Sequence, residues 1–167
     1  MNLMQKGEKK LQGIVLIEDT RQQANKHELK HEYFDSVGVK VFRQSLFVGD
    51  YTLPKNQSVC VDTKYGIQEL IGDVCSKDHE RFRAECLRAQ EAGIKLIVLL
   101  ETDEISNWHD LIYWHNPRKK NHPRATNGVQ LFRALVTMQQ RYGVQFRLCR
   151  KKDAGRAVLK LLGVEEL

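Results

Sequence analysis

Short apolar runs alternate with segments of helical periodicity along the 167-residue chain, a pattern typical of mixed α/β folds. Apolar runs and apolar–polar alternation predict strands over residues 13–17, 39–44, 46–53, 58–64, 94–101 and 144–149. Helical spacing of apolar residues predicts helices over 24–36, 67–74, 78–92, 129–142 and 154–162. A turn at 54–57 would join the third and fourth strands into a hairpin. The pattern predicts a polar tail over 1–12 and one α/β domain over 13–167, with a central mixed sheet flanked by helices.

Residues 102–128 depart from this pattern. They contain both tryptophans, three of the histidines and the basic run Arg118-Lys119-Lys120. We expect a short helix near 108–113 and then an exposed loop that contacts DNA phosphates or stacks on unpaired bases. Three alternatives stay open: the segment is merely an exposed, partly ordered loop, its aromatic residues pack against the domain, or its histidines bind zinc without the help of a thiol.

Composition narrows the class of partner. The net charge is +6 and basic residues gather at 81–88, 118–124 and 147–152, which favours an anionic partner. No apolar run approaches the roughly 18 residues that a membrane span needs, and the polar start lacks the apolar centre of a signal peptide. The four cysteines are widely spaced, so we interpret them as reduced thiols. We therefore expect a cytoplasmic protein with no membrane partner.

The predicted hairpin carries three charged side chains that point to one place. Strand side chains alternate between faces, so Asp62 and Lys64 share a face. A turn centred on Asn56 puts residues whose numbers sum to 112 opposite each other, and this pairs Asp50 with Asp62. Opposed carboxylates repel, and a hard divalent cation relieves that repulsion. The spacing therefore indicates a metal site.

These residue types fit metal-assisted hydrolysis of a phosphodiester. Mg²⁺ prefers oxygen ligands and keeps several waters, one of which can attack phosphorus while Lys64 holds it or offsets charge in the transition state. Asp19 ends a neighbouring strand and is placed to join as a further acid, and Arg21 is placed to hold a phosphate. The alternative is a solvated Asp62–Lys64 ion pair on an edge strand.

A longer series of motifs resembles the nuclease domain of the XPF family, within the PD-(D/E)XK superfamily. That family has V-D-x-R-E at a strand end, then G-D, then E-R-K-x-x-x-D, a helix opening near R-[FL] and an apolar strand ending in Glu. Over about residues 13–101, the chain has the same elements in the same order: IEDTRQ from Ile17, VGDY from Val48, VDTK from Val61, RF at Arg81 and LIVLLE ending at Glu101. The chain is similar to short, stand-alone versions found in phages and bacteria.

The resemblance implies a restriction-endonuclease-like fold and a Mg²⁺-dependent (or Mn²⁺-dependent) DNA endonuclease for branched DNA. Its site would comprise catalytic Asp50, Asp62 and Lys64, metal-binding Asp19, Asp50 and Asp62, and DNA-binding Arg21, Arg81, Arg118, Lys119 and Lys120. Homodimers are common among such domains.

The sequence departs from the family motif at three positions. Asp62 replaces Glu, Thr63 replaces Arg, and Gln68 replaces the last Asp, with Glu69 adjacent. Some members of the family have lost catalysis. A silent DNA-binding or scaffold module of the same fold is therefore the alternative function.

Two further patterns have competing interpretations. His27-Glu28-x-x-His31 fits a zinc protease motif, but its charged surroundings favour a solvated helix face. The stripe Leu131, Leu135, Met138, Tyr142 has the spacing of a helix face that packs in a core, and a seam between two copies is the alternative.

Overall fold

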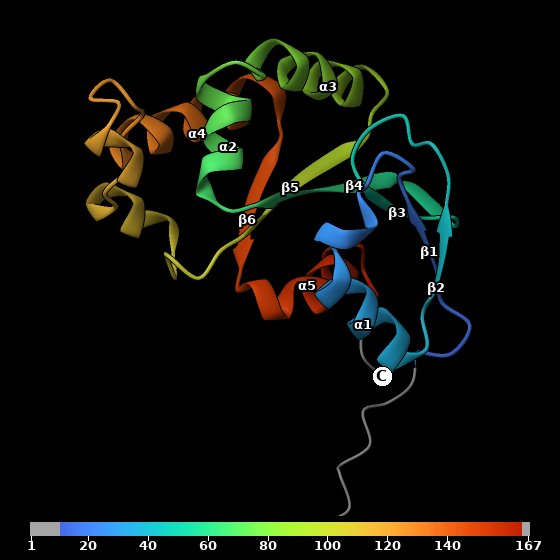
Figure 1. The fold of residues 1–167 in the computed structure, drawn as a ribbon. Helices are drawn as coiled ribbons and strands as arrows, with labels where there is room; N and C mark the ends of the chain where they lie inside the picture. Colours follow the sequence, from blue (N-terminus) through green and yellow to red (C-terminus); the bar gives the residue numbers. More distant parts are fainter. Residues whose placement is uncertain (1–10, 165–167) are drawn as a thin grey trace, which may run out of the picture.

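The computed structural model describes residues 11–164, and this part of the chain forms a six-stranded sheet in the order β2-β1-β3-β4-β5-β6 (Figure 1). The strands are β1 (Val15–Glu18), β2 (Lys40–Arg43), β3 (Tyr51–Leu53), β4 (Asn56–Tyr65), β5 (Lys95–Glu101) and β6 (Gln145–Cys149). β3 runs antiparallel to both of its neighbours and the other pairs are parallel. The predicted mixed sheet of an α/β fold is confirmed.

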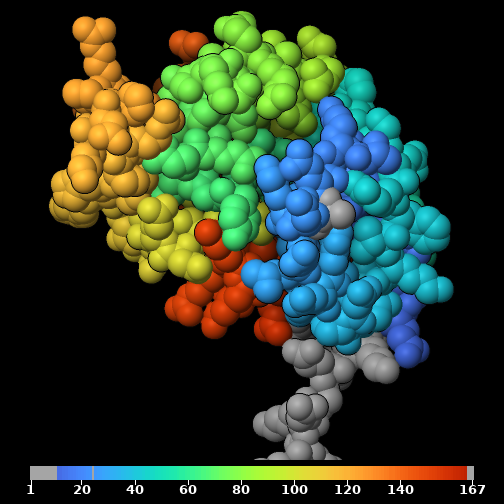
Figure 2. All heavy atoms as spheres, in the orientation of Figure 1, coloured from blue at the N-terminus to red at the C-terminus, as the bar shows by residue number. Residues whose placement is uncertain are grey.

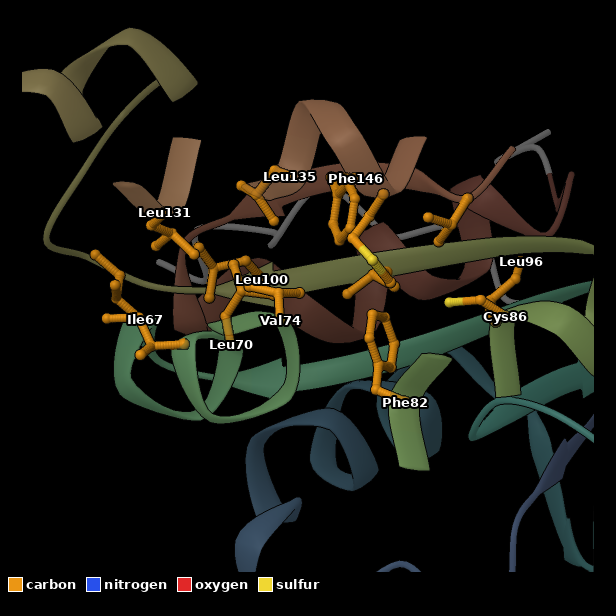
Figure 3. Packing of buried hydrophobic residues seen from close by; sticks show 14 of the residues in the cluster. Ile67, Leu70, Val74, Phe82, Cys86, Leu96, Leu100, Leu131, Leu135 and Phe146 are labelled. Atoms are coloured by element: carbon orange, nitrogen blue, oxygen red, sulfur yellow. The ribbon is translucent and has the colours of Figure 1, made fainter. Parts of the chain in front are cut away.

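Helices cover both faces of the sheet. α1 (Glu28–Val37) and α5 (Ala154–Leu161) lie on one face, and α2 (Ile67–Cys75), α3 (His79–Glu91) and α4 (Gly128–Tyr142) lie on the other (Figure 1). Each face has its own apolar cluster, and Figure 3 shows the one beneath α2, α3 and α4. Leu131, Leu135 and Met138 are buried in that cluster, so the interpretation of their stripe as core is confirmed.

The N-terminal end of the described chain contacts the domain, in contrast to the polar tail that we predicted over residues 1–12. Residues 1–10 of that tail lie outside the described residues. Leu11 is buried, and its backbone N–H donates to the carbonyl of Val37 at 2.6 Å. Leu11, in the segment that we predicted as tail, thus packs against the domain.

The hairpin has the predicted register but a different shape. Tyr51 pairs with Val61 and Thr52 with Cys60, as the predicted pairing requires. The turn is tighter than predicted, because the register shifts between Thr52 and Leu53 and Leu53 then pairs with Asn56. The prediction of a strand over 46–50 is wrong: Gly49 has φ +73° and lies close to β4, where a Cβ would be 3.1 Å from the Cβ of Cys60. This bend turns Asp50 towards β4.

The first helix also begins later than predicted. Residues Ala24–Lys26 form a 3₁₀ turn, and α1 starts at Glu28. The polar segment between β1 and α1 supplies few apolar residues to pack a full helical face, so the regular helix forms only where Phe34 and Val37 reach the core.

Residues 102–128 form a compact lobe beside α2 rather than a simple loop. They contain two 3₁₀ helices, Trp108–Tyr113 (η2), as predicted, and Pro117–Lys120 (η3), which replaces part of the predicted loop. The indole of Trp108 meets the ring of Phe146 edge-on, with 6.5 Å between ring centroids. Figure 2 shows the lobe in yellow and orange at one end of the visible face. The aromatic residues Trp108 and Trp114 thus help to pack the lobe onto the domain.

Gly128 controls how closely the lobe approaches α4. A Cβ at this position would lie 1.7 Å from the carbonyl oxygen of Leu111. We expect Gly128→Ala to destabilise the domain by about 2 kcal/mol or more, because backbone must move to make room. Urea denaturation measures the change. Gly72→Ala in α2 is the matched control: it has room and removes a helix-interior glycine, so it should stabilise by up to about 1 kcal/mol. Equal midpoints for the two variants would contradict the packing described.

Candidate active site

A polar pocket opens between strand β4, the bend that precedes β3, and helices α2 and α3. Its lining residues come from five parts of the chain: Arg21, Gly49, Asp50, Asp62, Lys64, Asp73, Arg81, Phe82, Glu85 and Arg88. Side chains of both signs are therefore concentrated in one depression.

Asp50 and Asp62 meet in this pocket, as the strand register requires. Asp50 is half-buried, and its Oδ2 accepts hydrogen bonds from the backbone N–H of Thr63 at 2.7 Å and from the Thr63 hydroxyl at 3.0 Å. Burial, and then the charge of Asp62, raise the pKa of the Asp50 carboxyl well above its usual range. The two carboxylates therefore repel each other when both are ionised.

Lys64 lies on the same face of β4 and is held between two acids. Its Nζ is 2.9 Å from Oδ2 of Asp62 and 2.7 Å from Oδ2 of Asp73, and it sits 5.5 Å from the centroid of the Phe82 ring. Burial alone would lower the pKa of the Lys64 ammonium, but the charges of Asp62 and Asp73 raise it overall. Lys64 is therefore a permanent cation at neutral pH.

Two acids of the pocket, Asp73 and Glu85, were not among the predicted site residues. Asp73 is buried on α2 and Glu85 is half-buried on α3, where its Oε1 accepts a hydrogen bond from the N–H of Gly49 at 2.8 Å. Burial, and then the charge of Asp62, raise the pKa of the Glu85 carboxyl. Each acid interrupts an apolar helical stripe, next to Val74 and Cys86 respectively, and a carboxylate in such a stripe needs a buried partner. That signal was available in the sequence.

Asp19 and Arg21 bind each other. The carboxylate of Asp19 accepts from Nε of Arg21 at 2.7 Å and from the backbone N–H of Leu46 at 2.7 Å. Burial would raise the pKa of the Asp19 carboxyl, but the hydrogen bonds from Arg21 and Leu46 lower it overall. Asp19 does not line the pocket, whereas Arg21 does. The structure thus brings Asp50, Asp62 and Lys64 together and places Asp19 behind Arg21.

The predicted DNA-binding residues fall into two groups. Arg21 and Arg81 are exposed at the pocket rim. Arg118, Lys119 and Lys120 are exposed on η3, and the lobe is tied to α2 by a 2.7 Å hydrogen bond from Nε2 of Gln68 to Oδ1 of Asn116. The basic residues of η3 therefore lie on the same side of the sheet as the pocket, because the lobe that carries them is bonded to α2, which forms one wall of the pocket.

The positions that replace the last motif acid point away from Lys64. Gln68 binds Asn116, and Oε2 of Glu69 accepts from the backbone N–H of Tyr65 at 2.9 Å. Asp73, farther along α2, contacts the lysine instead.

The segment from His27 to His31 is not the fully solvated face that we predicted, because His27 and Lys30 are buried. Nε2 of His31 is 2.7 Å from Oε2 of the buried Glu18, and His27 is largely buried. His109, His115 and His122 are exposed and dispersed over the lobe. No group of three His, Cys, Asp or Glu side chains within residues 11–164 is arranged to hold a metal ion, so the zinc alternatives find no support there.

The pocket nevertheless suits an oxygen-liganded ion held by two carboxylates. Oδ2 of Asp62 is buried and has no hydrogen bond of good geometry among the described residues, although Nζ of Lys64 is near. Mg²⁺ typically binds one or two carboxylates and keeps its other ligands as waters. Asp50 and Asp62 fit that demand, and Asp73 and Glu85 are further acids on the pocket wall.

A comparison with models of protein families finds one match. The model described as the ERCC4 domain matches residues 18–161, which is most of the chain. The chain belongs to the ERCC4 domain family. The resemblance to XPF-type nuclease domains is thus confirmed.

A solved structure shows the same fold as this ERCC4 domain. The chain is similar to XPF from Aeropyrum pernix, with a TM-score of 0.61 at 15% sequence identity, and the similarity covers 89% of this chain. It covers 63% of the XPF chain, so the ERCC4 domain spans less than two thirds of that protein. No curated protein sequence matches the chain. Among the described residues, no helix is long and apolar enough to cross a membrane.

The crowded carboxylates predict a pH-dependent stability. Folding raises the pKa values of Asp50 and Glu85, so both acids favour the folded state when they are protonated. Their contribution to the free energy of unfolding is fully present below their ordinary pKa, near 4, and is lost as the pH rises through the folded pKa values. With EDTA, the melting temperature should therefore fall from about pH 5 towards pH 8. Added Mn²⁺ should raise it most at the upper end. Scanning calorimetry tests this, with Glu85→Gln expected to flatten the slope and exposed Glu91→Gln to leave it unchanged.

Proposed function

We propose that this ERCC4 domain is a Mg²⁺-dependent DNA endonuclease that cuts branched DNA such as flaps, forks or four-way junctions. The observation that carries the proposal is the convergence of Asp62 and Lys64 from one face of β4 with Asp50 from the adjoining bend, in one pocket rimmed by arginines. Membership of the ERCC4 family supports nuclease chemistry. The preference for branched DNA rests on the family resemblance alone.

The residues of the pocket divide the chemical work. Asp50 and Asp62 would hold Mg²⁺ or Mn²⁺, which when bound supplies a Lewis acid and a more acidic water beside the scissile phosphate. The ammonium of Lys64 can donate hydrogen bonds to the attacking water or to a phosphate oxygen on which charge develops. Asp19 acts at one remove, because it fixes the guanidinium of Arg21 at the rim.

Two basic regions would grip the DNA backbone. Arg21 and Arg81 at the rim are close enough to the acids to contact phosphates beside the cut. Arg118, Lys119 and Lys120 on η3 would contact phosphates of the duplex farther from the cut, on the same side of the sheet as the pocket. Phosphate contacts of this kind position the substrate without reading its sequence.

A silent DNA-binding module of the same fold is the second candidate. The structure contains an observation in its favour: Lys64 is paired with two acids and Oδ2 of Asp50 with Thr63, so the groups are partly neutralised by one another. Such a module would keep the basic surfaces and bind DNA without cutting it.

Other expectations remain proposals about the whole protein. We place it in the cytoplasm of a bacterium or of a phage-infected cell. A homodimer stays a prediction from the resemblance, and the stripe Leu131, Leu135, Met138 cannot form its seam because these residues are buried within the domain.

Cleavage assays separate the two candidates. Labelled flap, fork and four-way substrates incubated with Mg²⁺ should be cut, and EDTA should abolish the cut. Asp62→Asn should slow cleavage about a thousandfold, because it removes a metal-holding charge, while DNA binding in gel-shift assays persists. Exposed Asp35→Asn on α1 makes the same chemical change away from the pocket and should cut at the normal rate. Tight binding by the unmutated protein, without metal-dependent cutting, would favour the silent module.

The lobe has a separate test. Replacing Arg118, Lys119 and Lys120 together by Gln should weaken DNA binding by a similar factor for unrelated sequences. The slope of log K against log salt should fall by up to about 3, because each lost phosphate contact removes roughly 0.9. Gln at exposed Lys40, Lys152 and Lys160 removes the same charge elsewhere and is the control. Equal salt slopes for the two triple variants would show that the lobe does not contact DNA.

A further inference from the structure

Lys64 has two carboxylate partners, and they come from different elements. Asp62 is two residues away on the same strand, whereas Asp73 reaches the ammonium from α2, with Nζ–Oδ2 distances of 2.9 and 2.7 Å. Asp73 is 5% exposed, so water has little access to its carboxylate. Removal of either Lys64 or Asp73 would therefore leave the other as a poorly solvated charge, which is destabilising.

The two partners are not equivalent in the proposed reaction. Asp62 must give its carboxylate to the divalent ion, and Lys64 then loses one of its two anionic neighbours. A half-buried ammonium without a partner is unfavourable, and it would compete with the ion for Asp62. Asp73 is the carboxylate that stays paired with Lys64 both before and after Asp62 binds the ion.

The surroundings of Asp73 suit such a role. Its carboxylate lies on the pocket wall, and α2 is fixed by the buried side chains of Leu70 and Val74 on either side. The ring of Phe82 bounds the lysine on the α3 side. The ammonium is thus held at a defined position that does not depend on Asp62.

We propose that Asp73 is a positioning residue that retains Lys64 when Asp62 binds the metal ion. This inference rests on the proposed function and extends it, because neither Gln68 nor Glu69 touches the lysine and the sequence motif assigns no role to position 73. Asp73 acts through Lys64 and does not itself contact DNA or the reacting atoms.

A double-mutant cycle tests the inference without relying on catalysis. Mn²⁺ binding is measured by titration calorimetry for the full chain and for Asp73→Asn, each with Lys64 or with Lys64→Met. We expect Asp73→Asn to weaken Mn²⁺ binding about tenfold when Lys64 is present, because the freed ammonium then binds Asp62, and by about twofold or less in the Lys64→Met background. An equal loss in both backgrounds would overturn the inference, because Asp73 would then act only through its charge or through the fold.

Variants with conserved charge complete the design. Asp73→Glu should restore most of the Mn²⁺ affinity and most of the cleavage rate at saturating Mn²⁺, both of which Asp73→Asn lowers. Glu69→Gln removes one charge from the same helix without touching Lys64 and should change neither. Thermal melting identifies any variant that does not fold, and Asp73→Ser then replaces Asp73→Asn.

The outcomes separate this inference from the proposed function. If the unmutated protein binds Mn²⁺ and cuts DNA, Asp62→Asn loses both and the cycle shows no coupling, only the inference about Asp73 fails. If the unmutated protein binds no Mn²⁺ at millimolar concentration, the proposed function fails and the inference fails with it.

Discussion

The burial of several carboxylates beside one ammonium group is the constraint on which this site depends. Asp50, Asp62, Asp73 and Glu85 share a pocket with Lys64, and burial raises the pKa values of three of these acids. The protein tolerates the repulsion because other groups are already in place: the amides of Thr63 and Gly49 donate to Asp50 and Glu85, and Lys64 pairs with the other two acids. These four acids thus outnumber the one ammonium that they surround, although Arg21, Arg81 and Arg88 also line the pocket, and a divalent cation can neutralise the charge left on Asp50 and Asp62.

The opposite face of the sheet handles buried charge in another way. There Nζ of the buried Lys30 on α1 is 2.7 Å from both carboxylate oxygens of Glu101 at the end of β5. Glu18, at the end of β1, accepts from the hydroxyl of Tyr51 at 2.8 Å and lies against His31. Lys30 and Glu101 form a closed pair, whereas Oε1 of Glu18 has no hydrogen bond among the described residues and lies 3.4 Å from Nε of Arg43. The contacts of Lys30 and His31 fix α1 onto the strand ends. The paired charges on this face contrast with the acid-rich set on the other, and this contrast supports the proposed site beneath α2 and α3.

The positions of Asp50, Asp62 and Lys64 in the hairpin could be predicted from the sequence, because side chains alternate along a strand and pairing sets which residues lie opposite each other. Alternation puts Asp62 and Lys64 on one face, and the pairing of Tyr51 with Val61 brings Asp50 beside them. The apolar stripes around Asp73 and Glu85 mark both acids as buried, but the pocket that they reach depends on how α2 and α3 pack on the sheet, and spacing does not specify that packing. Asp19 ends its strand as predicted, yet Arg21, two residues on, captures its carboxylate. Rotamer choice of this kind depends on the loop at Leu46 and cannot be read from spacing.

The departure at position 68 shows why a motif position and a structural role need not coincide. β4 ends at Tyr65 and α2 begins at Ile67, so only one residue separates the strand that carries Lys64 from the helix that carries Asp73. In this chain the contact comes from Asp73, which leaves Gln68 free to bind Asn116 at the base of the basic lobe. Asn116 in turn donates to the carbonyl of Thr126 and accepts from the N–H of Arg118. The helix whose Asp73 holds the lysine is therefore also the helix whose Gln68 binds the lobe.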